Sequence, residues 1–171
     1  MNIFYIISQI ITVLMFIFLG VSFYFKDRKK ILLANIFAQI CQIVSTLLLK
    51  GFTGALMSII MLLSYNTMYA DYMFNRKENK IRNVMILLIY FILIIFVTSL
   101  SFNGYASIIA ALATIILLFG LWQRNLKIYK ICGIIGSILW LIYYNYLKSI
   151  FGVVLEIILI ISTLISYMKN K

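Results

Sequence analysis

One acidic residue, Glu156, lies well inside an apolar segment of the chain, residues 150–168. By helical rise it is roughly 9 Å from the start of that segment, and a carboxyl group at such a depth in hydrocarbon is costly and usually functional. Burial favours its neutral form, and Lys148, two turns earlier, is placed to neutralise it in part. Glu156 is therefore suited to binding a cationic group, carrying a coupling proton, or hydrogen-bonding a neighbour.

Polar side chains also recur at helical spacing in the segment 31–49. Spacings of four, three and four residues put them on one helical face, and they are Asn35, Gln39, Gln42 and Thr46. An amide that faced lipid would carry a large desolvation cost, so we expect this face to point inward. It would either line a path for a solute or fasten helices together through hydrogen bonds.

The segment 128–147 carries a matching small or polar face. Its Trp140 is suited to stacking against a flat ligand. The full set of candidate substrate-binding residues is Asn35, Gln39, Gln42, Ser58, Ser137, Trp140, Tyr144 and Glu156. Tyr143 and Tyr146, near the end of this segment, are expected to belong to an interfacial aromatic belt. The glycines expected to allow close helix contact are Gly54, Gly133, Gly136 and Gly152.

The residues needed for catalysis are missing from these faces. The chain has no histidine, and its one deep carboxyl group is too few for an aspartyl mechanism, which needs two. No serine or cysteine has a plausible activating partner. Cys41 and Cys132 are isolated within apolar segments and form no metal or redox motif. We expect neither enzymatic activity nor a cofactor or metal.

The composition indicates which solvent surrounds these residues. Of 171 residues, 65% are hydrophobic and 11% are charged, which is more apolar surface than a globule of this size can bury. Lipid is therefore the expected environment. A bilayer core about 30 Å thick needs about 20 helical residues, and seven continuous apolar runs qualify: 3–25, 31–49, 52–70, 84–100, 105–122, 128–147 and 150–168.

The basic residues test this count of seven. All fifteen lie in connections, in tails or, for Lys130, in the first turn of a run, with thirteen on one side of the predicted membrane and only Lys50 and Lys148 on the other. The positive-inside rule then places the amino terminus outside and the carboxyl terminus in the cytoplasm. The run at 26–30 is read mainly as a topology signal, with an anionic-lipid site as the alternative. Because this pattern accounts for the net charge of +11, no nucleic acid partner is expected.

An internal repeat organises the seven spans. At an offset of 98 residues, positions 10–69 align with 108–167 without a gap, and fifteen of the sixty pairs are identical. We therefore predict an all-α protein of two parallel three-helix repeats joined by a linker helix, an arrangement that SWEET sugar transporters exemplify. The divisions are a first repeat at 1–73, a loop and linker helix at 74–103, and a second repeat at 104–171.

The stretch from Trp140 to Asn145 (WLIYYN), followed by Ser149 to Glu156 (SIFGVVLE), resembles bacterial inner-membrane proteins of the YgjV type. The resemblance covers nearly the whole chain and includes Gly54 and the basic stretch after the first span. That family looks like a branch of the SWEET and PQ-loop (MtN3-like) group, whose members carry sugars, vitamins or amino acids or act as sorting receptors. The chain departs from that group in having no proline, so the resemblance does not supply its proline hinges.

The expected function is a transporter or facilitator in the bacterial inner membrane, with its substrate between the two repeats. Neutral polar or cationic metabolites fit best, because no basic side chain is predicted at the midplane. The alternative is a non-transporting binding subunit, such as the substrate-capture component of a vitamin importer. Two fused repeats would complete a pathway in a monomer, and a homodimer stays open.

Overall fold

The computed structural model describes residues 3–25, 27–74, 79–123 and 126–169, which contain seven α-helices and no strand. One helix forms from each predicted apolar segment, because an isolated apolar run can satisfy its backbone groups only within itself. The helices are α1 (Ile3–Tyr24), α2 (Arg28–Leu48), α3 (Phe52–Met73), α4 (Lys80–Leu100), α5 (Tyr105–Leu121), α6 (Leu126–Tyr146) and α7 (Ile150–Lys169).

The lengths and composition of the helices suit a multi-pass membrane protein. In the described part of the chain, α1, α2, α4 and α6 each hold a stretch long and apolar enough to cross a membrane, and α5 and α7 hold shorter apolar stretches. α3 has similar length but carries several polar residues along it. Large apolar side chains are exposed along the outer faces of the helices, as expected where lipid is the solvent.

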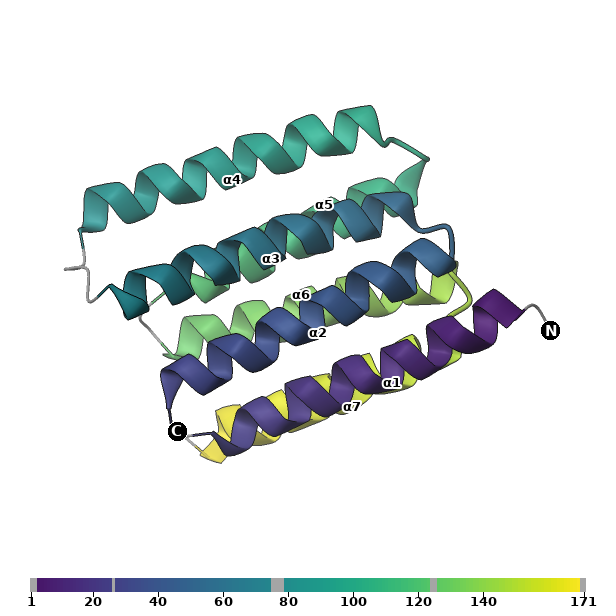
Figure 1. The fold of residues 1–171 in the computed structure, drawn as a ribbon, viewed down its shortest axis with the longest axis horizontal. Helices are drawn as coiled ribbons and strands as arrows, with labels where there is room; N and C mark the ends of the chain where they lie inside the picture. Colours follow the sequence, from purple (N-terminus) through teal and green to yellow (C-terminus); the bar gives the residue numbers. More distant parts are fainter. Residues whose placement is uncertain (1–2, 26, 75–78, 124–125, 170–171) are drawn as a thin grey trace.

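Six helices form a closed ring. α1, α2, α3, α5, α6 and α7 each contact the next in that order, and α7 contacts α1. In Figure 1 the ring appears as two layers, with α1, α2 and α3 in front of α7, α6 and α5. α2 and α6 lie opposite each other, and their backbones are not in contact. The polar faces of these two helices are therefore separated by the interior of the ring.

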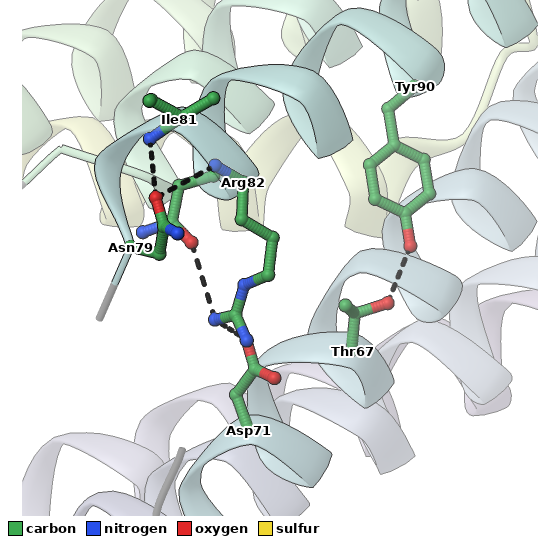
Figure 2. A network of polar contacts seen from close by, with 7 residues as sticks. Thr67, Asp71, Asn79, Ile81, Arg82 and Tyr90 are labelled. Atoms are coloured by element: carbon green, nitrogen blue, oxygen red, sulfur yellow. Dashed lines mark hydrogen bonds and ion pairs between the residues drawn. The ribbon is translucent and has the colours of Figure 1, made fainter. Parts of the chain in front are cut away.

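α4 lies outside the ring against α3 and α5 (Figure 1). Only its Tyr90 and Ile94 are buried, which suits a helix that faces lipid over most of its surface. Polar contacts attach it to α3 (Figure 2): Arg82 forms a 2.7 Å ion pair with Asp71, and the Tyr90 and Thr67 hydroxyls are 2.7 Å apart. Asn79 caps the start of α4 by accepting hydrogen bonds from two backbone N–H groups. The ring is thus complete without α4.

The two ends of the bundle differ in charge. We call the end where α1, α3, α5 and α7 finish the basic end and the opposite end the far end.

At the far end, the α2–α3 and α6–α7 turns each contain a lysine with positive φ, Lys50 at 60° and Lys148 at 56°. In each turn the next residue donates its N–H to the carbonyl five positions earlier, at 2.8 and 3.0 Å, which is a Schellman ending. The two turns share one geometry.

Several glycines allow helices to approach closely. A Cβ on Gly120 would lie 2.6 Å from the Cβ of Cys132, and one on Gly54 would lie 2.5 Å from the Tyr143 ring. Gly136 and Gly152 are similarly crowded, as predicted. The prediction was wrong for Gly133, where a Cβ would meet only a methyl group of Thr163 at 4.0 Å. Gly133 leaves space inside the ring instead of closing a helix contact.

This contrast gives a matched pair of substitutions. Gly120→Ala places a methyl group against a Cβ that is fixed to the α6 backbone, so we expect a loss of about 1–3 kcal/mol. Gly133→Ala meets no obstruction, and we expect unchanged stability or a gain of up to about 1 kcal/mol from helix propensity. Thermal unfolding of the purified protein in detergent measures both. Equal midpoints for the two variants would contradict this account of helix spacing.

Candidate functional site

A cavity of about 370 Å³ lies inside the ring. All six ring helices contribute to its wall, so it is enclosed by the bundle as a whole. At one limit it reaches Phe25 after α1, and Ile31 and Tyr129 in the first turns of α2 and α6. Its deepest wall residues on these two helices are Gln42 and Trp140. The cavity therefore extends from the basic end to the middle of the bundle, and none of the described residues in its wall lies at the far end.

Six of the eight predicted site residues line this cavity. They come from α2, α6 and α7, and they are Asn35, Gln39, Gln42, Ser137, Trp140 and Glu156. The faces of α2 and α6 that the spacing of polar residues identified are thus turned towards each other across the cavity. Ser58 and Tyr144 are fully buried but do not contribute to the wall.

Ser58 is turned towards its own helix. Its hydroxyl donates a 2.9 Å hydrogen bond to the Gly54 carbonyl, four residues earlier, which is a common arrangement for serine within a helix. Tyr144 lies just beyond the cavity, with its ring 5.8 Å from the Trp140 ring. It is close enough to Gln42 and Glu156 to interact with both electrostatically.

Several buried polar atoms at the cavity have no hydrogen-bond partner. Among the described residues, four buried side-chain atoms lack one, and three of these are Gln39 Oε1, Glu156 Oε2 and the Tyr144 hydroxyl. Ser137 interacts with the Glu156 carboxyl group, but this leaves Oε2 unsatisfied. A buried polar group without a partner costs about 1–3 kcal/mol. Their concentration at one cavity indicates that a ligand or water completes the site.

Aromatic rings close the cavity towards the far end. The Trp140 ring is 5.3 Å from that of Tyr143, in an edge-on contact. Tyr143 is only 2% exposed, and its hydroxyl accepts a 2.9 Å hydrogen bond from the Gly54 N–H. The expected interfacial position of Tyr143 was therefore wrong, because its hydroxyl caps the first turn of α3. Tyr146 is exposed and stacks edge-on with Tyr105.

A second polar contact seals the opposite side of the far end. Gln9 Oε1 accepts a 3.0 Å hydrogen bond from the Phe151 N–H in the first turn of α7, and its Nε2 donates to the Ser149 hydroxyl at 3.3 Å. The Tyr5 hydroxyl donates to the Lys148 carbonyl at 3.1 Å. Unlike those at the cavity, the polar side chains named at this end form hydrogen bonds with one another and with the backbone groups of helix termini.

The sequence did not identify every wall residue. Tyr65 and Tyr129 lie on the wall and close enough to interact. Tyr65 follows Ser58 by two helical turns, and this spacing does predict that it shares the inward face of its helix, whereas Tyr129 occurs among apolar residues with no such signal. Met15 and Met61 also line the cavity, and nothing in the apolar pattern separates them from lipid-facing residues.

The charges around the site are few. Within the described residues no lysine or arginine forms an ion pair with Glu156, and Lys148 is exposed at the far-end turn instead of neutralising it. The described residues also hold no group of three metal-ligating side chains. The site is thus one carboxyl group among amides, hydroxyls and aromatic rings, with aliphatic and methionine side chains making up much of the remaining wall.

These features define a multi-pass α-helical membrane protein with a one-sided polar cavity. The family model Imp-YgjV, described as a bacterial inner membrane protein, matches residues 6–171, and the chain belongs to this family. The resemblance to YgjV-type proteins is confirmed, as is the assignment to the bacterial inner membrane. No curated protein and no solved structure matches the chain. The relation to SWEET and PQ-loop proteins stays a prediction.

Cysteine accessibility tests the cavity directly. In a protein whose Cys41 and Cys132 are replaced by alanine, we expect Ser137→Cys to react with a small polar thiol reagent, because position 137 faces the cavity. Ser58→Cys is the matched control, since it is the same substitution at a serine that is fully buried and lies outside the cavity wall. Mass spectrometry of the intact protein measures the modified fraction. Equal labelling of the two variants would argue against an accessible cavity at Ser137.

Proposed function

We propose that this protein is a carrier or facilitator for a small polar solute, which binds in the central cavity. The observation that carries the proposal is the set of unpartnered buried polar atoms at this cavity. A volume of about 370 Å³ is near the lower end of the range for small-molecule sites, roughly 300–1,000 Å³. Apolar helices can pack together without amide or acid side chains. A polar ligand therefore explains the presence of these side chains at the cavity better than helix packing does.

The proposed architecture is two parallel three-helix repeats, α1–α3 and α5–α7, with α4 as the linker. Shifting α2 by 98 residues gives 126–146, the bounds of α6. The positive-φ lysines at 50 and 148 differ by the same 98. Contacts between these two three-helix repeats, which we call triplets, are also paired. The first helix of each triplet lies against the third helix of the other, as α1 with α7 and α5 with α3. This pairing supports a pseudo-two-fold axis along the membrane normal.

The proposed orientation has seven spans, an outer amino terminus and a cytoplasmic carboxyl terminus. Its support is the asymmetry of thirteen basic residues against two. With this orientation the far end is outside, and the cavity opens towards the cytoplasm. The structure then corresponds to an inward-facing state of a carrier, with Tyr143, Gly54, Gln9 and Ser149 closing the outer side.

Movement between states would occur by rocking of the two triplets. The chain has no proline, so a proline-kinked helix is not available, and rigid rocking of repeats is the general alternative. The contacts that such rocking must exchange are those between α1 and α7 and between α3 and α5, which are less extensive than the contacts within each triplet. A coupling proton on Glu156 stays a prediction within this proposal.

Blocking the cavity tests transport. A thermal-shift screen of sugars, nucleosides, vitamins, amino acids and polyamines supplies the solute, which is then followed into proteoliposomes. We expect Gly133→Leu to reduce uptake at least tenfold, because the leucine side chain fills space that Gly133 leaves open. Gly20→Leu is the matched control, since a Cβ there meets nothing and Gly20 is not in the wall.

The outcomes of this experiment separate the candidate functions. Uptake that Gly133→Leu leaves unchanged would remove the cavity from the transport path. Stabilisation by a solute without any uptake would favour the non-transporting binding subunit over the carrier.

The locations of the two termini test the span count. Seven spans place them on opposite sides of the membrane, so we expect an amino-terminal tag to be digested by protease added to intact spheroplasts and a carboxyl-terminal tag to be protected. Digestion after lysis is the control for both tags. Protection or digestion of both tags together would contradict seven spans.

A further inference from the structure

We infer that the solute carries a protonated amine, which pairs with the Glu156 carboxylate inside the cavity. This rests on the proposed role of the cavity as the binding site and narrows the class of ligand. It depends on three independent features of the wall, namely its charge, its unsatisfied atoms and its aromatic faces.

The charge of the wall is the first feature. Among the described wall residues, Glu156 is the only one with a carboxyl group, and none of them is a lysine or arginine. The chain has no histidine at all. An anionic solute would therefore meet a carboxyl group and no counter-ion, whereas a cation would neutralise the one charge that the wall can carry.

The unsatisfied atoms of the wall are the second feature, and Glu156 carries one of them. The side chain is 5% exposed, and the groups facing it from α6 are the neutral Ser137 and Tyr144. Among the described residues it forms no ion pair. A buried carboxylate is tolerated when it is both paired and hydrogen-bonded, and the part of the chain that the structure describes supplies no cation to pair with it.

Two of the three unpartnered atoms at the cavity are oxygen acceptors only. Glu156 Oε2 and Gln39 Oε1 receive no donor from the described residues, and the third atom, the Tyr144 hydroxyl, can accept as well as donate. An ammonium group has three donors and no acceptor, so it matches this deficit. Protonation of Glu156 does not remove the deficit, because a hydroxyl at Oε2 would itself need an acceptor and none is present at that atom.

Aromatic faces are the third feature. Trp140, Tyr65 and Tyr129 line the cavity, and Trp140 is 3% exposed. A cation within about 6 Å of such a ring is attracted to its electron-rich face, most strongly when both are shielded from water. The cavity volume of about 370 Å³ limits the ligand to a small amine.

The test uses three four-carbon probes that differ only in their end groups. They are 1,4-diaminobutane, 1,4-butanediol and succinate, with butylamine and choline as further ammonium compounds. We expect at least one ammonium compound to raise the unfolding midpoint of the detergent-purified protein by about 2 °C or more. The diol and succinate are expected to have no effect. Glu156→Gln, which keeps the shape of the side chain, is expected to weaken ammonium binding at least tenfold.

Tryptophan emission supplies a second measurement that does not depend on Glu156→Gln folding. The chain has two tryptophans, so Trp122→Phe leaves Trp140 as the only one. We expect the ammonium probe to change its emission, and Gly133→Leu in the same protein to abolish the change. Ser162→Ala, an exposed position on α7, is the control and is expected to bind normally.

Four results would overturn the inference. They are no response to any ammonium compound, an equal response to the diol or succinate, an ammonium response that survives Glu156→Gln, and Trp140 emission that the probe leaves unchanged. The carrier proposal fails separately. If an ammonium compound binds but is not taken up, the carrier proposal fails and the amine site is retained. If a neutral solute is taken up, and this uptake is blocked by Gly133→Leu but unaffected by Glu156→Gln, the amine site is rejected and the carrier proposal is retained.

Discussion

A polar group inside hydrocarbon has no water to bond with, so its partners must come from the protein or from something the protein encloses. The two halves of this bundle meet that requirement differently. At the far end, Gln9, Ser149 and Tyr143 bond to one another's helices and to helix termini. Near the middle of the bundle, Gln39 and Glu156 face the cavity that opens towards the basic end, and they keep unpartnered oxygens. The polar groups of the far end are therefore satisfied within the protein, whereas those at the cavity are not.

Tyrosine and glycine together make the far end close-fitting. The Tyr143 ring occupies the space that a side chain at position 54 would need, and the Tyr144 ring does the same at position 152. Two aromatic rings on α6 thus pack against bare backbone on α3 and α7, the helices on either side of the cavity's end. Because a ring and a peptide backbone are both rigid, this contact is either fully made or broken, with few intermediate arrangements.

The sequence predicted the faces of helices better than the distances between them. Spacings of three and four residues were enough to place Gln39, Gln42 and Ser137 on inward faces, because hydrocarbon penalises every other orientation. Ser58 has the same register as Glu156 in the internal repeat, yet only Glu156 reaches the cavity. The longer side chain extends beyond its helix, whereas the short serine hydroxyl bonds to its own backbone.

The predictions that were wrong depended on neighbours that sequence alone does not reveal. Tyr143 was placed at the membrane interface because it is near a helix end, but the Gly54 N–H offers it a buried partner from another helix. Gly133 was assigned to close packing by its residue type, although Thr163 is the nearest side chain and lies a full contact distance away. Glycine permits both a tight contact and an empty space, and only the position of the facing helix decides between them.

The space at Gly133 has an evolutionary consequence. Most residues that shape the cavity also support the fold, so changing them alters stability and capacity together. At position 133 stability and capacity are separate for a small side chain, because an added Cβ would meet only the Thr163 methyl group, at 4.0 Å. A single nucleotide change there can reduce the capacity of the cavity in small steps while leaving the rest of the protein intact. Selection can therefore adjust the volume of the cavity by acting on one codon.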